Sequence, residues 1–255
     1  IKVDLHKMTE GRQDATIMVA YLEQKERTDE ALLAATAKAD RLLNEIEEMV
    51  AMNCTAVDIA YSPNDLYRLK REGKKAIMLG IENGYAIGKD LSRVAHFRKR
   101  GVVYMTLCHN GNNDICGSAR YNEENLGVTP FGEQVIQEMN RLGMMVDLSH
   151  SGERTFYETL DISSQPVVCS HSSSRALCDH PRNLTDEQLR AIARKGGVVQ
   201  VCLYSGFLRK ERPAHILDAI EHLNHMVNVM GIEHVGIGSD LTVTEVLSDA
   251  TTLRK

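Results

Sequence analysis

The amino-acid sequence predicts an α/β protein built as a (β/α)8 barrel of the TIM type, with its first strand missing from the chain. Short apolar runs of strand length alternate with helical patterns almost throughout the 255 residues. No linker, internal repeat or low-complexity segment divides the chain, so we expect one domain spanning residues 1–255. No glycine-rich phosphate turn follows the early strands, which disfavours an open doubly wound sheet.

The strands are indicated by short apolar runs that are rich in β-branched residues. Seven such runs are found where a closed barrel needs eight, and we place the missing strand before Ile1. The opening IKVDLHKM lacks an initiator Met and is interpreted as a truncated or processed beginning. The expected strands span residues 14–22, 75–81, 102–107, 144–148, 166–169, 197–203 and 235–238.

Helical patterns with capping residues fill the intervals between the strands. The longest begins at Thr28 and carries an apolar stripe. Another begins at Ser62-Pro63 and is closed by Gly73. Residues 110–128 are rich in Asn and Gly, and we expect a long loop that covers a site. The expected helices span residues 28–52, 62–72, 90–100, 129–142, 152–160, 185–195 and 211–230.

Composition and charge exclude several functional classes. The formal net charge is −5, and Lys and Arg are scattered along the chain, so no basic face for nucleic acid is predicted. No apolar run approaches the roughly 20 residues of a membrane span, and no signal peptide opens the chain. The six cysteines form no C-x-x-C pair, and most of them, within or just after apolar runs, are interpreted as small buried hydrophobes. Cys108 and Cys169 lie beside histidines, but a ligand role for them is disfavoured.

The tripeptide Ser-His-Ser ends two neighbouring strands. It occurs at Ser149–Ser151 and at Ser170–Ser172, each time after a buried apolar run. Because the carboxyl ends of parallel strands meet at one edge of a sheet, His150 and His171 are expected to lie side by side. Two converging neutral imidazoles are typical of a transition-metal site, whereas one strand-end histidine more often hydrogen-bonds in a loop.

Further polar residues follow other strands at the same predicted end of the barrel. They are Glu82, His109 and Asp240. Carboxylates and imidazoles form a ligand set that suits Zn²⁺, and a carboxylate can bridge two metals. Taken singly, Glu82 could pair with an arginine, Asp240 could cap a loop, and His109 could hold the asparagine-rich loop. Their common position favours a single metal site.

Two other groups of residues have a weaker signal. Arg182 lies on the loop after the second Ser-His-Ser strand, where its guanidinium could clamp a substrate carboxylate, with an ordinary surface arginine as the equal alternative. His222 and His225 are three residues apart in a predicted helix. We interpret them as polar residues on the outer face of that helix.

The motifs that carry these residues occur in a fixed order along the chain. They are GIENG with Glu82, TLCHN with His109, VDLSHSG with His150, SHSSSRAL with His171, HPRN with Arg182 and GIGSD with Asp240. Together they resemble the membrane dipeptidase (renal dipeptidase) family of zinc peptidases, peptidase family M19, from Val3 to Asp240. The resemblance implies a metallo-dependent hydrolase barrel of the amidohydrolase type, which hydrolyses dipeptides.

The resemblance also implies the metal ligands. Glu82 would bridge two zinc ions, and His150 and His171 would bind one of them, with two Zn²⁺ per chain expected in the full-length protein. The family carries a His-x-Asp pair on its first strand that has no counterpart here, and its Asp-Phe-Asp-Gly continuation is absent after Asp240. Both departures suit a stretch of a longer protein. They also suit a degraded barrel that binds one metal.

The resulting hypothesis is hydrolysis of the peptide bond of dipeptides by a metal-bridging hydroxide. By the same resemblance, His109 would stabilise the oxyanion, Asp240 would carry the proton from water to the leaving amine, and Arg182 would hold the substrate carboxylate. The alternatives are another amidohydrolase-type hydrolase, acting on a lactam, a D-amino-acid amide or a phosphoester, and a catalytically silent metal-binding barrel. We expect a soluble protein of the cytoplasm or periplasm; a homodimer and the chirality of the substrate stay open.

Overall fold

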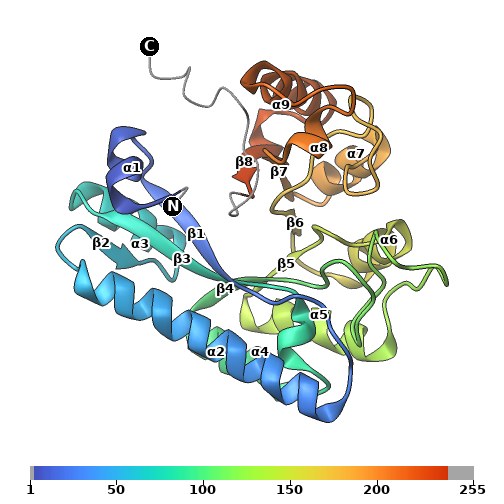
Figure 1. The fold of residues 1–255 in the computed structure, drawn as a ribbon, viewed down its shortest axis with the longest axis horizontal. Helices are drawn as coiled ribbons and strands as arrows, with labels where there is room; N and C mark the ends of the chain where they lie inside the picture. Colours follow the sequence, from blue (N-terminus) through green and yellow to red (C-terminus); the bar gives the residue numbers. More distant parts are fainter. Residues whose placement is uncertain (1–2, 241–255) are drawn as a thin grey trace.

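Seven parallel strands follow one another in a continuous, curled sheet, and an eighth strand pairs with one of them outside this order. The computed structural model describes residues 3–240. Within them the strands pair in the order β1-β3-β4-β5-β6-β7-β8, and Figure 1 shows the helices arranged around this sheet. The bounds are β1 Ala15–Tyr21, β3 Lys75–Glu82, β4 Val102–Thr106, β5 Met145–Asp147, β6 Val168–Cys169, β7 Val198–Cys202 and β8 Val235–Ser239.

This strand order confirms the predicted α/β class, because neighbours in the barrel-type sheet follow one another along the chain with helices between them. All seven expected strands are present. An additional strand, β2 (Val57–Ile59), pairs in parallel with the first residues of β3 and is not predicted from the sequence. It has only three residues, one of them Asp58, so its apolar pattern is too short to be recognised. The strand expected before residue 1 stays a prediction.

The predicted helices are confirmed, and their capping residues act as expected. The Thr28, Ser62, Thr129 and Thr185 side chains all accept hydrogen bonds from backbone N–H groups of the first helical turn. The bounds are α1 Leu5–Glu10, α2 Asp29–Met52, α3 Pro63–Arg71, α4 Ser92–Lys99, α5 Pro130–Leu142, α6 Glu153–Ile162, α7 Asp186–Arg194, α8 Ser205–Leu208 and α9 Ile216–Met230. Short 3₁₀ turns, η1 Gly84–Ile87 and η2 Ile232–His234, complete the elements.

The sequence misplaces or misses some of the helices. Helices α1 and α8 are not predicted, and α9 begins at Ile216 rather than near residue 211. The start of α9 is set by Asp218, whose carboxylate accepts a hydrogen bond from the His215 backbone N–H at 2.8 Å. In the described part of the chain no helix combines the length and apolar character needed to cross a bilayer.

The strand register brings the carboxyl ends of the central strands level. Glu82 of β3 pairs with Thr106 of β4, and Thr106 pairs with Asp147 of β5. Below these residues the strands bury aliphatic side chains such as Ile77 and Leu79 against the helices. The packed core therefore holds the strand ends, and the turns that follow them, in fixed relative positions.

The loop between β4 and α5 is long and irregular, as predicted, but it is well tied down. The Asn113 side chain donates a hydrogen bond to the Leu107 carbonyl at 2.8 Å and accepts hydrogen bonds from the backbone N–H groups of Ile115 and Cys116. The Ser118 hydroxyl donates to the His109 carbonyl at 2.6 Å. These bonds fix the segment that follows His109.

Candidate metal centre

Four of the predicted site residues converge on one point at the carboxyl edge of the sheet. The Oε1 atom of Glu82 lies 3.3 Å from His150 Nε2, 3.4 Å from His171 Nε2 and 3.8 Å from His109 Nε2. Glu82, His150 and His171 each offer a ligand atom, and these atoms all lie within 4.8 Å of one another. The side chains come from the ends of four adjacent strands, β3 to β6. The prediction that these strand ends meet is confirmed.

The protonation states of this cluster suit a metal rather than ion pairs within the protein. Burial, with the negative charges of Asp240 and Asp147, raises the pKa of Glu82 to about 8 against the smaller opposing effect of Arg182. Burial and Arg182 together lower the pKa of His109 to about 4 and that of His171 to about 3. The pKa of His150 is also lowered, mainly by burial. The imidazoles are therefore neutral near pH 7, which is the form that binds metals.

The ring nitrogens of the two Ser-His-Ser histidines are oriented for metal binding. His171 Nδ1 lies 2.8 Å from the Ser170 hydroxyl, and His150 Nδ1 lies 3.2 Å from the Asn110 side-chain oxygen. Both Nε2 atoms point toward Glu82, and His171 Nε2 is buried without a hydrogen-bond partner among the described residues. A buried, unpartnered nitrogen beside a carboxylate fits a bound cation, so the residues present fit the predicted metal.

The backbone at His150 adopts an uncommon conformation that its surroundings enforce. Its φ angle is +71°, in the left-handed region that few residues other than glycine adopt. The His150 carbonyl accepts hydrogen bonds from the Ala119 N–H at 2.7 Å and from the Ser118 hydroxyl at 3.2 Å, and the Cys108 thiol lies 3.7 Å away. The fixed loop therefore aims this imidazole at the cluster.

His109 occupies the edge of the cluster. Its ring lies between the rings of His150 and Tyr21, with centroids 4.0 and 4.9 Å away. It lies farther from Glu82 than the other two imidazoles and is not part of the group whose ligand atoms are mutually close. Its position therefore suits contact with a molecule bound at the cluster better than metal ligation.

Arg182 is buried beside the cluster, which contradicts the alternative of a surface arginine. Its side chain is 3% exposed, and one terminal guanidinium nitrogen donates to the His171 carbonyl at 3.2 Å. The guanidinium stands over the Phe207 ring at 5.4 Å, and its Nε has no hydrogen-bond partner among the described residues. Burial lowers the pKa of this group, and nearby acids oppose that effect. The arginine therefore has donor capacity left for an anion.

Asp240 lies at the end of β8, where the last predicted strand meets the same edge. Its carboxylate accepts a hydrogen bond from the Cys202 thiol at 3.6 Å. Its φ of 58° lies in the left-handed region. Its charge contributes to the shifted pKa values of both Glu82 and His171. Asp240 is therefore within electrostatic reach of the cluster. The residues that follow Asp240 lie outside the described range.

One interpretation of the histidines outside the cluster is wrong. His222 does not lie on the outer face of its helix: it is buried, with Nδ1 accepting from the Ser174 N–H at 3.0 Å and Nε2 3.2 Å from the Leu208 carbonyl. It connects the loop after the second Ser-His-Ser tripeptide to α8. His225 is partly exposed and pairs with Asp186 at 2.7 Å. The cysteines are free and, Cys54 apart, buried; Cys108 and Cys169 are not part of the cluster.

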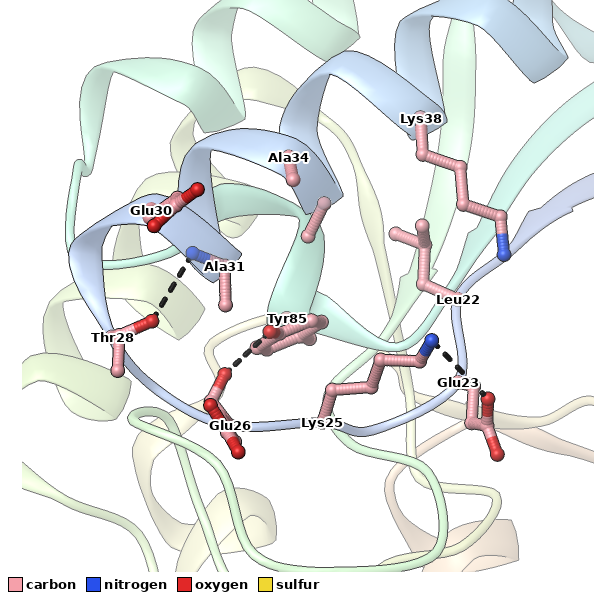
Figure 2. A pocket seen from close by; sticks show the side chains of 11 residues that line it. Leu22, Glu23, Lys25, Glu26, Thr28, Glu30, Ala31, Ala34, Lys38 and Tyr85 are labelled. Carbon is pink, nitrogen blue, oxygen red and sulfur yellow. Dashed lines mark hydrogen bonds and ion pairs between the residues drawn. The ribbon is translucent and has the colours of Figure 1, made fainter.

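Two hollows elsewhere lack the predicted site residues. One of them, with a volume of about 390 Å³, lies at the start of α2. Figure 2 shows its lining, in which the Tyr85 hydroxyl donates to the Glu26 carbonyl and Lys25 pairs with Glu23. The other, of about 720 Å³, lies between α1, β1 and α2 and is mainly apolar. Neither lining includes a cluster residue. The candidate site is therefore the convergence of Glu82 and the imidazoles.

Comparison with known proteins agrees with the motifs. Residues 1–255 match the family described as Membrane dipeptidase (Peptidase family M19). The chain is 43% identical over 176 residues to an uncharacterised dipeptidase of Schizosaccharomyces pombe, covering 67% of this chain and 42% of that protein. It is 31% identical over 244 residues to dipeptidase tcpJ of Claviceps purpurea, covering 93% and 57%. The structure of the probable dipeptidase PvdM from Pseudomonas aeruginosa superposes with a TM-score of 0.89 at 26% identity, covering 95% and 77%.

The chain belongs to the membrane dipeptidase family, peptidase family M19. It spans about half the length of the two curated relatives.

Proposed function

We propose that this member of the membrane dipeptidase family is a zinc-dependent dipeptidase. One observation carries the proposal: three neutral imidazoles direct nitrogen atoms at the same oxygen of a buried glutamate. Within residues 3–240 no lysine or arginine forms an ion pair with Glu82, and nitrogen and oxygen donors at this spacing suit zinc. The names of the relatives, which are dipeptidases, support the substrate class.

Glu82, His150 and His171 would hold the zinc. A second zinc would share the Glu82 carboxylate and would need further ligands, for which residues 3–240 offer no second group of mutually close donors. We expect two zinc ions per chain in the full-length protein. When bound, the metal would polarise the scissile carbonyl and lower the pKa of water.

The chain's own residues would bind the substrate and move its protons. Arg182 would pair with the C-terminal carboxylate of the dipeptide, since its buried guanidinium has an unused donor. Neutral His109, at the edge of the cluster, would donate a hydrogen bond to the carbonyl oxygen as negative charge develops there. The Asp240 carboxylate would accept the proton of the attacking water and deliver it to the leaving amine.

The test is hydrolysis by the full chain, with zinc added and after zinc removal by a chelator. Dipeptides should be hydrolysed with zinc, lose hydrolysis on chelation and regain it on readdition. His150→Ala should lose zinc and activity, whereas the matched control His96→Ala removes a surface imidazole, paired with Asp40, and should keep both. Hydrolysis of a lactam or a D-amino-acid amide with no dipeptide hydrolysis would support the alternative hydrolase. Zinc binding without hydrolysis of any of these would support the silent barrel.

A further inference from the structure

We propose that Asp147, acting through the Ser170 hydroxyl, is a positioning residue that fixes the tautomer of His171 and presents its Nε2 to the metal. The inference rests on the proposed metal site. It gives a role to two residues that precede the histidines in the motifs VDLSH and CSH, where the sequence indicates only strand ends.

Asp147 lies at the end of β5 and is fully buried. Its Oδ1 accepts hydrogen bonds from the backbone N–H groups of Ser149 and Ser170 at 3.0 and 2.9 Å. Its Oδ2 accepts from the hydroxyls of Thr106 and Ser170, both at 2.6 Å. Four donors therefore surround one side chain. An ionised carboxylate, which accepts at every position, satisfies all four of them.

The proton positions then follow from the number of hydrogens available. The Ser170 hydroxyl has one hydrogen, which it donates to Asp147 at 2.6 Å. The Ser149 hydroxyl is farther away, at 3.4 Å, and the neutral Tyr104 hydroxyl, which also interacts with Ser170, is a weaker acceptor than the carboxylate. The hydroxyl must therefore accept from His171 Nδ1, 2.8 Å away. A neutral imidazole has one N–H, so His171 Nε2 carries a lone pair. That atom is the buried, unpartnered nitrogen 3.4 Å from Glu82.

The same carboxylate also holds both Ser-His-Ser turns in register. It binds the backbone of Ser149 after β5 and of Ser170 after β6, and the Ser149 hydroxyl accepts from the His171 N–H at 3.0 Å. His150 differs, because its Nδ1 meets a neutral amide oxygen of Asn110 at 3.2 Å. A buried anion thus supports His171, whereas a neutral amide supports His150. Such outer partners typically change metal affinity by about 10- to 100-fold.

The first experiment compares Ser170→Ala with Thr106→Val by zinc affinity, measured by competition with a chelator. Both variants remove one hydroxyl that donates to Asp147 Oδ2 at 2.6 Å, and only Ser170 also contacts His171. Ser170→Ala should weaken zinc binding by about 10- to 100-fold. Thr106→Val, the matched control, should lose comparable folding stability and much less affinity. Equal losses of affinity in the two variants would overturn the inference and leave the metal site in place.

The second experiment reads the tautomer of His171 directly by ¹⁵N NMR of the zinc-free full chain. The wild type should show the proton on Nδ1. In Asp147→Asn the new amide NH₂ would donate to the Ser170 hydroxyl and free its hydrogen, which can then be donated to Nδ1; we therefore expect the ring proton on Nε2. A purely structural role for Asp147 would not reverse the tautomer, and an Nε2–H proton in the wild type contradicts the inference. A wild type with no zinc affinity would contradict the proposed function, and this inference with it.

Discussion

Two buried carboxylates of this molecule, Glu82 and Asp218, have opposite electrostatic surroundings. Asp218 in the first turn of α9 accepts hydrogen bonds from Arg209 at 2.7 and 3.0 Å, from Arg212 at 2.8 and 2.9 Å, and from the His215 backbone. Burial acts to raise its pKa, but the bonds from Arg212, His215 and Arg209 outweigh burial and lower it. The Glu82 carboxyl group is approached by three neutral imidazoles, and burial with the charges of Asp240 and Asp147 raises its pKa to about 8.

The difference separates a carboxylate that supports the fold from one that is built for a ligand. The chain supplies the cations that Asp218 needs, so this acid fastens α9 to the segment after α8. In the part of the chain that the structure describes, no cationic side chain contacts Glu82 directly, and the ring nitrogens of the three imidazoles that approach it are neutral. An acid left in this state costs free energy until a cation binds, which is typical of functional sites.

The largest effect is expected for Glu82→Gln. Replacing this carboxylate ligand with a neutral amide should weaken zinc binding severely and lower kcat/KM on a dipeptide by about a thousandfold, or about 4 kcal/mol. If Glu82 bridges two metals, both should be lost together. Mass spectrometry of the intact protein measures the zinc content, and initial rates measure kcat/KM. Loss of only one metal would make Glu82 a terminal ligand.

A smaller effect is expected for Arg182→Lys, which keeps the charge but loses the planar guanidinium. The expected loss in kcat/KM on a dipeptide is about ten- to a hundredfold, because a charge-assisted bond contributes about 1.5 to 3 kcal/mol. The dipeptide amide lacks the carboxylate, so kcat/KM on it should already be low in the wild type. It should fall little further in the variant. Equal losses on both substrates would show that Arg182 does not bind the carboxylate.

The comparison itself is tested by the sign of two stability changes. Asp218→Asn should lower the free energy of unfolding by about 2 kcal/mol, since it weakens hydrogen bonds to two arginines, and should leave zinc affinity unchanged. Glu82→Gln should raise the free energy of unfolding of the zinc-free protein, because a buried carboxyl group is replaced by a neutral amide. Urea unfolding of zinc-free samples measures both. Destabilisation by both substitutions would contradict the proposed difference between a carboxylate that stabilises the fold and one that is placed for a ligand.

The free energy of unfolding of the zinc-free protein should change gradually with pH. The folded pKa of Glu82, about 8, lies above its unfolded value near 4.5, so the folded state binds more protons between these values. Stability should therefore fall as the pH rises from about 4.5 to 8, by at most about 1.4 kcal/mol per pH unit for this group. Thermal unfolding across this range, with Glu82→Gln as the variant without the contribution, tests the sign. A slope that persists in the variant belongs to other groups.

The sequence predicts where the cluster residues lie better than it predicts the hydrogen bonds that hold them. The ends of parallel strands must share one edge, so Glu82, His150 and His171 are recognisable from apolar runs followed by polar residues. The contacts of Asp147 and Ser170 depend on side-chain hydrogen bonds between β5 and β6, which no spacing reveals. The burial of His222 has a similar origin, since α8 and the loop near Ser174 cover it.

The most direct test of the account is anomalous diffraction at the zinc absorption edge from crystals of the full chain grown with zinc. We expect an anomalous peak about 2.0 to 2.2 Å from His150 Nε2, from His171 Nε2 and from a Glu82 carboxylate oxygen. His109 should lie outside this coordination sphere. A zinc-containing crystal with no peak among these three side chains, or with the peak elsewhere, would contradict the assignment of the metal centre.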